Sequence, residues 1–488
     1  MGASQEKKRR LDAKTSGEFK VNERDAETQK KNKKFKITAI ITTILFVLCV
    51  IIVLLTRTKF MYQKLTAVTV GDTKYSIADY NYFKVIARNE LYNYFGGEDA
   101  AKSYVTDDMI EGAALNRMQY ATAYADLARE AGYSLSEDGK ATVDSNVELQ
   151  SMYASISKVS LNKYLSSGFG FGVDEDVFRR NMELVTLMNE YGSKLYKDLE
   201  YSDAELEEKY DPAKDDVLAY YLFSVNNSDQ ENEETAADDA KAVAEEFASK
   251  VTDAASFEAL TYEYAPETSK IYYKQDPKTS LNHTSASALN ETYSEWLLDS
   301  ARKAGDVEVF SDDNGAYVVY FVERSDNKYT PVSVRQIFFP HGVTYSDYLS
   351  DKEYEDAYAA AIEDAHSSAE EALNTWKDGE MTEDAFAYLA QSYNANDNSG
   401  GLISVMQKGA YNEAVEKWCF DSARKEGDTA VIDTPQGSYV LYFIEEYSQN
   451  YRQYIADSAL RSEEFNTMEQ EAIVPYTVKK AFGFRFAS

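Results

Sequence analysis

A duplicated stretch of 29 residues limits more than any other feature how this chain can fold. Residues 418–446, WCFDSARKEGDTAVIDTPQGSYVLYFIEE, align without a gap with residues 296–324, WLLDSARKAGDVEVFSDDNGAYVVYFVER, and 15 of the 29 positions are identical. A β-like run opens each copy further upstream, so the repeated unit is a whole domain of about 110–120 residues. We place the two copies at residues 213–328 and 329–447.

The pattern inside each copy predicts one sheet covered by helices. In the second copy, residues 416–425 have helical spacing and Gly427 ends the helix. Strands follow at residues 429–433 and 438–446, on either side of the turn TPQG. Each copy is therefore expected to be an α+β domain.

The N-terminal region contains a candidate membrane helix. Residues 37–55 carry no charge over 19 positions, which is long enough to cross a bilayer. A cleavable signal peptide is the rival interpretation, but 36 polar residues precede the run and no small-residue cleavage site follows it. We predict a retained single-pass helix at residues 37–56 of a cell-membrane protein. The basic tail, residues 1–36, has 12 Lys or Arg against 6 acids, which predicts a cytoplasmic N-terminus and an extracytoplasmic remainder.

Charge and cysteine content restrict the partners and the compartment. The whole chain has a net charge of −32, which becomes −38 once the +6 of the basic tail is set aside. Such an acidic exterior repels nucleic acid, so we expect no nucleic-acid partner. The chain has only two cysteines, and one of them, Cys49, lies in the apolar run, so no disulfide can form within the exterior. A long exterior without disulfides suits a bacterial envelope.

Residues 60–212 have the pattern of a mostly helical domain. Residues 66–76 alternate around a Gly-Asp turn and predict a small hairpin before the first helix. Helix starts are predicted at Ser76 and Ser202 from capping boxes and at Thr106, and further helical patterns cover residues 136–156 and 175–199. The final segment, residues 448–488, has helical spacing over residues 448–482, and this helix could pack back on the helical domain.

Several motifs of the second copy resemble those of a known family. VRQIFF at 334–339, AFAYLAQSY at 385–393, NSGGLISVMQKGAY at 398–411 and TPQGSYVLYFIEE at 434–446 occur in the order typical of parvulin-type (PpiC-like) peptidyl-prolyl isomerases. The first copy has lost the Gly-Gly loop and is the more degenerate.

The helical domain adds a second resemblance. LAREAGYSLS at 127–136 and SDAELEEKY at 202–210 are similar to the N-terminal chaperone domain of SurA/PrsA-type extracytoplasmic foldases. This resemblance implies a membrane-anchored foldase that binds unfolded or secreted polypeptides and needs no cofactor. A non-catalytic scaffold of the cell envelope, which uses parvulin-like folds as binding modules, is the alternative.

The resemblance also implies where isomerase chemistry would lie. Rotation about an X-Pro bond is opposed by a resonance barrier of about 18–20 kcal/mol, so a catalyst needs a pocket that favours the twisted state. The family places two histidines beneath this pocket, and the matching positions are Gln336 and Tyr439 in the second copy and Tyr220 and Tyr317 in the first. Because all four have changed, we expect isomerase activity to be weak or absent.

The remaining site positions are also carried over from the family. Asp397, or Asn394, lies near the position of the family's Cys or Asp, and Tyr411, Val415 and Phe420 would contact the proline ring. The alternative is that the apolar residues are ordinary core residues at helical spacing. His341 cannot replace the first histidine because it points to the other face of the strand, and His366 is expected on the surface of a helix. No residue spacing predicts a metal site or a hydrolase.

Overall fold

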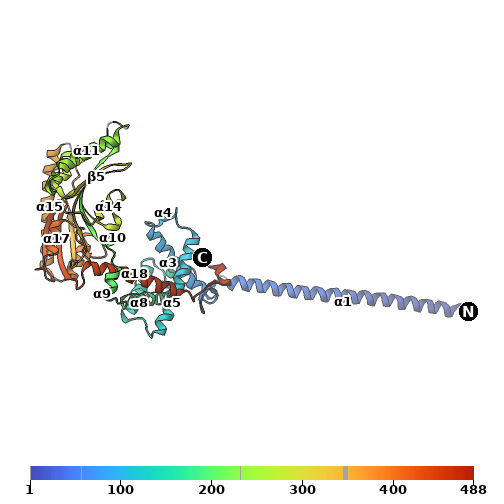
Figure 1. The fold of residues 1–488 in the computed structure, drawn as a ribbon. Helices are drawn as coiled ribbons and strands as arrows, with labels where there is room; N and C mark the ends of the chain where they lie inside the picture. The colour runs from blue at the N-terminus through green and yellow to red at the C-terminus, as the bar shows by residue number, and fades with distance from the viewer. Residues whose placement is uncertain (1, 56–57, 231, 233, 345–349, 488) are drawn as a thin grey trace. The chain divides into compact units, whose positions relative to one another are not determined.

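The computed structural model describes residues 2–55, 58–230, 232, 234–344 and 350–487, which form two compact units (Figure 1). The first unit is Met1–Leu199 with Glu464–Ser488, and the second is Glu200–Glu463. Both combine helices with antiparallel sheets, and the described residues contain three such sheets. The mixed helix and sheet composition expected from the sequence is therefore confirmed.

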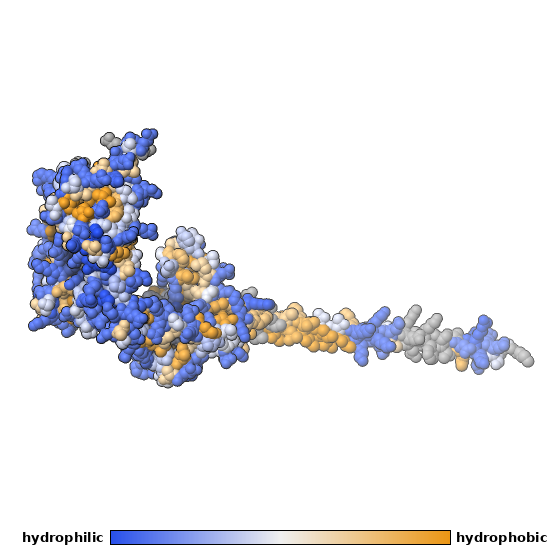
Figure 2. All heavy atoms as spheres, viewed as in Figure 1, coloured by the Kyte–Doolittle hydropathy of each residue, from blue (hydrophilic) through white to orange (hydrophobic). Residues whose placement is uncertain are grey.

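A single long helix, α1 (Ala3–Leu55), begins the first unit. Its stretch Asp25–Ile51 is long and apolar enough to cross a membrane, and the side chains of its most apolar window are not buried by the protein. Figure 2 shows apolar side chains gathered along one part of α1, with hydrophilic side chains nearer the N-terminus. Residues 37–55 of the predicted membrane segment thus lie within α1, and residue 56 lies outside the described residues.

The rest of the first unit is a helical domain with a small sheet. Its elements are α2 (Lys59–Lys64), β1 (Thr66–Val70), β2 (Thr73–Ser76), α3 (Ile77–Tyr94), α4 (Glu98–Ala101), α5 (Asp107–Glu130), α6 (Glu137–Ile156), α7 (Leu161–Gly168), α8 (Glu175–Lys197), β11 (Val478–Lys480) and η5 (Phe482–Phe486).

Local capping explains why these helices begin where the sequence predicts. Ser76 accepts a hydrogen bond from the Asp79 N–H, and the Asp79 carboxylate accepts one from the Ser76 N–H, which completes the capping box of α3. Thr106 caps α5 by accepting from the Met109 N–H. Both predicted helix starts are confirmed.

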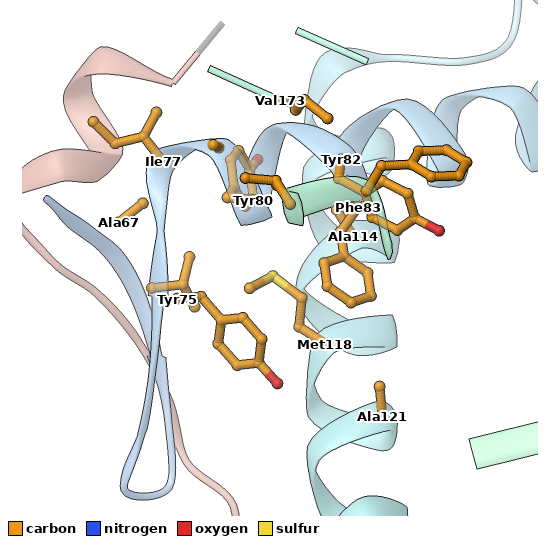
Figure 3. Packing of buried hydrophobic residues seen from close by; sticks show 14 of the residues in the cluster. Ala67, Tyr75, Ile77, Tyr80, Tyr82, Phe83, Ala114, Met118, Ala121 and Val173 are labelled. Atoms are coloured by element: carbon orange, nitrogen blue, oxygen red, sulfur yellow. The ribbon is translucent and has the colours of Figure 1, made fainter. Parts of the chain in front are cut away.

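The core of the first unit packs aromatic residues against small ones. Tyr80 and Phe83 of α3 and Ala114 and Met118 of α5 belong to this core, and Figure 3 shows Phe83 facing the side of α5 that carries the last two. All four are at most 2 % exposed. Because alanines leave room beside α5, a large ring of α3 can pack closely against it.

The chain returns to this unit at its C-terminus. β11 pairs antiparallel with β1, so the sheet order is β11-β1-β2. The prediction of a helix up to residue 482 is wrong for the end of the segment, because α18 (Tyr451–Ile473) stops at Ile473. Pro475 follows two residues later and cannot continue a helix, and the edge of β1 provides hydrogen-bonding partners for the following strand.

The second unit contains two domains of matching topology and the N-terminal part of α18. The linking helices and the first copy comprise α9 (Asp203–Lys209), α10 (Pro212–Asp215), β3 (Val217–Asn226), η1 (Asn227–Asp229), α11 (Ala236–Lys250), α12 (Ala254–Tyr264), α13 (Glu267–Gln275), η2 (Pro277–Ser280), β4 (Leu281–Ser285), η3 (Ala286–Ala288), α14 (Glu291–Leu298), β5 (Val307–Ser311) and β6 (Gly315–Ser325). The second copy comprises β7 (Val332–Pro340), α15 (Asp351–Lys377), α16 (Glu383–Tyr393), β8 (Leu402–Ile403), α17 (Glu413–Cys419), β9 (Thr429–Thr434) and β10 (Gly437–Glu446).

The sheet orders match between the copies, β4-β3-β6-β5 in the first and β8-β7-β10-β9 in the second. The two C-terminal strands predicted for the second copy are confirmed. The predicted helix over residues 416–425 is too long, because α17 ends at Cys419. There Asp421 accepts a hydrogen bond from the Ala423 N–H, which stabilises a turn in place of a further helical turn.

The sheet of the second copy has two covered faces. Ile337, Val440 and Tyr442 pack on one side in a cluster with residues of α15 and α16. Val334 and Leu441 point to the opposite side, into a cluster with residues of α17. Because side chains alternate along a strand, Gln336 and Tyr439 share this second face, on which we build the candidate site.

Candidate functional site

The two family histidine positions lie on adjacent strands of one face but in different surroundings. Tyr439 is opposite Phe338 on the neighbouring strand, with 4.4 Å between the ring centroids, whereas Gln336 is opposite Leu441. The Oε1 atom of Gln336 is buried and accepts no hydrogen bond from any described residue. Burial raises the pKa of Tyr439, so its hydroxyl stays protonated and can donate at neutral pH.

Tyr439 and Tyr411 line a cavity of about 1060 Å³, which we call the inter-copy cleft because residues of both copies surround it. Both tyrosines are half-buried. The volume is at the upper end of the roughly 300–1,000 Å³ found for small-molecule sites. The cleft is therefore large enough for a short stretch of extended polypeptide.

A buried carboxylate holds the loop that presents Tyr411. Glu416 Oε1 accepts the N–H of Gly409 at 2.7 Å and that of Tyr411 at 3.0 Å. Burial raises the pKa of Glu416, although the backbone donors oppose this. Gly409 has φ +86, which favours glycine. The sequence analysis missed Glu416, whose only signal is an acid within the apolar pattern of α17.

The other two predicted substrate contacts lie away from the cleft lining. Val415 is 1 % exposed and belongs to the core cluster of Val334 and Leu441. Phe420 packs edge-on against Tyr329, with 5.8 Å between ring centroids. These contacts are those of core and packing residues, which matches the alternative that the sequence left open.

Asp397 organises the Gly-Gly loop. Its Oδ1 accepts the Ser399 N–H at 2.8 Å, and its Oδ2 accepts the Gly401 N–H at 3.0 Å. Hydrogen bonds from Ser399 and from backbone N–H groups lower the pKa of Asp397. A Cβ on Gly401 would lie 2.1 Å from the Gln336 carbonyl oxygen, so this loop needs glycine where it meets β7. Asn394, the other candidate, ends α16.

In the first copy, the position equivalent to Val415 is surrounded by aromatic rings. Tyr293 occupies the place that Val415 has in the second copy, and it is 5 % exposed. Its ring centroid lies 5.8 Å from that of Tyr220 and 6.1 Å from that of Tyr317. The residues at the family histidine positions of the first copy therefore serve its core, which favours the second copy as the binding domain.

Two histidines of the second copy lie away from the cleft. His341 Nδ1 accepts the Val343 N–H at 3.0 Å, and its ring packs against Tyr358 of α15. His366 of α15 lies 2.9 Å from Asp433, whose carboxylate raises the pKa of this imidazole. Neither ring lines the cleft around Tyr439.

Cys419 offers a test of this packing. It is 1 % exposed, and burial raises the pKa of its thiol to about 12. Because only the thiolate reacts, we expect iodoacetamide at about pH 8 to leave Cys419 unmodified in the native chain and to modify it after denaturation in urea. Mass spectrometry of the peptide that contains Cys419 measures both rates. Equal labelling of native and denatured protein would contradict the packing of α17 on the sheet.

Comparison with known proteins finds partial structural similarity. No family model and no curated protein matches the chain. Among solved structures, peptidylprolyl isomerase (PrsA) from Bacillus anthracis is 13% identical over 30% of this chain and 58% of its own, with a TM-score of 0.18. Foldase protein PrsA from Streptococcus pneumoniae is 16% identical over 43% of this chain and 68% of its own, with a TM-score of 0.20. PrsA from Bacillus subtilis is 15% identical over 44% of this chain and 73% of its own, with a TM-score of 0.16.

These similarities are limited in extent. The chain matches 58% of the length of the Bacillus anthracis protein, and all three TM-scores are far below 0.5. The function of the chain is therefore inferred from its own residues.

Proposed function

We propose that this protein is a membrane-anchored extracytoplasmic foldase that holds unfolded or secreted polypeptides. The observation that carries the proposal is the inter-copy cleft of about 1060 Å³, which exposes the half-buried rings of Tyr411 and Tyr439. Tyrosine combines a broad apolar face with a polar tip and so suits contact with varied sequences. The order of a helical domain followed by two parvulin-like domains supports the same function.

The anchor is part of the proposal. α1 has the length and apolarity of a membrane span, and five lysines lie within the seven residues before its uncharged run. By the positive-inside bias, the N-terminus is cytoplasmic and both parvulin-like domains are extracytoplasmic. This arrangement keeps the client-binding domains close to the membrane that secreted chains cross.

Isomerase activity is expected to be weak or absent. Catalysis needs polar groups that orient the substrate in addition to an apolar pocket. Gln336 has its Oε1 enclosed away from solvent, which leaves Tyr439 as the hydroxyl donor of this face at the cleft. At the positions of the two family histidines, the second copy therefore has the buried amide oxygen of Gln336 and the phenol hydroxyl of Tyr439.

Aggregation assays test client binding. The full chain in nanodiscs should reduce light scattering by an unfolded protein at near-equal concentration, and empty nanodiscs provide the control. No reduction with any of several unrelated clients would overturn the foldase proposal.

In the same preparation, cis-to-trans conversion of an X-Pro peptide should remain near its uncatalysed rate. A rate typical of efficient isomerases would show that Gln336 and Tyr439 replace the histidines well.

A scaffold of the cell envelope is the second candidate, and the filled pocket of the first copy favours it. Tyr293 of this copy is buried against Tyr220 and Tyr317, so the residues at its family histidine positions are engaged in packing. Cross-linking in cells separates the two functions. Many transient secreted clients support the foldase, whereas one stoichiometric membrane or wall partner supports the scaffold.

A further inference from the structure

The inter-copy cleft has a wall that the second copy does not supply. Residues 275–283 of the first copy, which we call the wall segment, contribute Gln275, Lys278 and His283 to the lining. Tyr411 and Tyr439 line it from the second copy. Both copies belong to the same compact unit, Glu200–Glu463, so the cleft lies within that unit.

Polar contacts join the wall segment to the second copy. Lys278 forms an ion pair with Glu413 of α17. Gln436 Nε2 donates to Asp276 Oδ2 at 3.0 Å, and the Tyr354 hydroxyl donates to Gln275 Oε1 at 3.1 Å. These three contacts reach α17, the β9–β10 turn and α15, so the wall segment is held against three separate parts of the second copy.

The ring of His283 also lies against the second copy. A Cβ built on Gly409 would lie 2.4 Å from His283 Cγ, so the ring lies directly over the loop that presents Tyr411. Glycine is thus favoured at position 409 for two reasons. Its backbone has φ +86, and the absence of a Cβ leaves space for the ring of His283. A change in the size of the side chain at residue 283 therefore changes its packing against the loop that presents Tyr411.

The lining contains a buried polar group that has no hydrogen-bond partner among the described residues. Gln275 Nε2 is buried and donates no hydrogen bond within the described part of the chain. A buried donor left unpaired is unfavourable, and a backbone carbonyl of a bound peptide would accept its hydrogen bond. Gln275 already holds its Oε1 against Tyr354, so the unpaired donor belongs to a side chain fixed in place.

The charge of the lining is negative. Glu258, Asp276 and Glu416 line the cleft and form no ion pair among the residues described, whereas Glu413 is paired with Lys278. Lys417 is the one further cation of the lining. An excess of carboxylates within a recess attracts positive charge and repels negative charge.

We propose that the first copy is the second wall of the client site, and that the two copies together hold an extended cationic segment of an unfolded polypeptide. This inference rests on the proposed foldase function and adds to it the substrate class and a role for the degenerate copy. The apolar residue of the segment lies against Tyr411 and Tyr439. The backbone of the segment faces Gln275. The basic side chains of the segment face the carboxylates of Glu258, Asp276 and Glu416.

Peptide binding to the full chain in phosphatidylcholine nanodiscs tests the shared cleft. The probes are two fluorescent peptides with a central Phe-Pro, one flanked by lysines and the other by glutamates. His283→Trp, which enlarges the ring over Gly409, should weaken binding of the lysine peptide by about tenfold or more. His366→Trp is the matched control, because it makes the same change on α15 away from the cleft, and binding should remain unchanged.

The charge preference has its own variant. Wild-type protein should bind the lysine peptide at least about tenfold more tightly than the glutamate peptide, and added salt should reduce the difference. Glu258→Gln should narrow this preference while it keeps an acceptor for the Tyr221 hydroxyl, which donates to Glu258. Equal binding of both peptides by the wild-type protein would overturn the proposed substrate class.

Photo-cross-linking keeps the test independent of whether a variant folds. A benzophenone at the Phe position of the lysine peptide should mark both the wall segment and residues 409–411 of the wild-type chain. Cross-links to the second copy alone, or full binding by His283→Trp together with loss of binding by Tyr411→Ala, would overturn the shared cleft and leave the foldase function intact. No peptide binding together with no suppression of aggregation would overturn both proposals.

Discussion

Truncation after Ile473 is expected to unfold the first unit. The removed segment contains β11, the partner of β1, and the side chains of Tyr476, Val478 and Phe484, which pack against the main core cluster. These side chains are partly buried, so each contributes a part of the about 1.5–3 kcal/mol of full burial, and together with the lost pairing of β1 the loss is a large fraction of the roughly 5–15 kcal/mol by which typical domains are stable. Hydrogen exchange of the backbone amides of β1, α3 and α5 in the full-length and truncated chains measures the effect.

A single substitution should reproduce much of this loss. A Cβ on Gly483 would lie 2.5 Å from the Thr66 carbonyl oxygen, so Gly483→Val must push η5 away from β1. Phe482→Ala is the neighbouring control, because Phe482 is 64 % exposed. Native-like protection of α3 and α5 in the truncated chain would show that the returning segment is dispensable for the first unit.

Phe386→Ala is expected to destabilise the second copy by about 3–5 kcal/mol, the usual cost when a large buried ring is removed. Phe386 is 0 % exposed, and its ring centroid lies 5.5 Å from that of Tyr442 and 6.2 Å from that of Trp376. The cavity left by the ring would remove contacts that α16 makes with α15 and with the sheet. Urea unfolding, followed by alkylation of Cys419, measures the change.

The same helix provides the control for this substitution. Tyr388 is 77 % exposed, so Tyr388→Ala should leave the urea midpoint of Cys419 alkylation nearly unchanged. Because Phe386 and Cys419 lie on opposite faces of the sheet, earlier labelling in Phe386→Ala would report cooperative unfolding of the whole domain. Unchanged labelling in Phe386→Ala would mean that the two faces are stabilised independently.

Local chemistry explains which elements could be predicted. Ser76 and Thr106 start helices through hydrogen bonds to N–H groups three residues away, so a short window of sequence contains the whole cause. Ser202 caps α9 in the same way. The duplication predicted two domains of one topology because matching patterns of apolar residues bury the same faces.

The errors arose where distant parts of the chain compete with local spacing. The helical pattern that ends near residue 482 gives way to β11, because β1, about 400 residues earlier in the chain, offers an open strand edge. The helix predicted over residues 416–425 stops at Cys419, because a turn at Asp421 replaces the next helical turn ahead of β9, which begins at Thr429. Neither outcome could be read from the periodicity of the segment alone.

The candidate site divides in the same way. The motifs of the sequence, through their resemblance to a family, predicted that Gln336 and Tyr439 lie on adjacent strands, and alternation along each strand together with the pairing of β7 and β10 places both on one face of the sheet. Only the tertiary structure decided that Tyr293 fills the pocket of the first copy, that Glu416 holds the loop of Tyr411, and that His283 lies over Gly409. These contacts join residues from separate elements or separate copies, and their geometry follows from how the domains pack and not from any local pattern of residues.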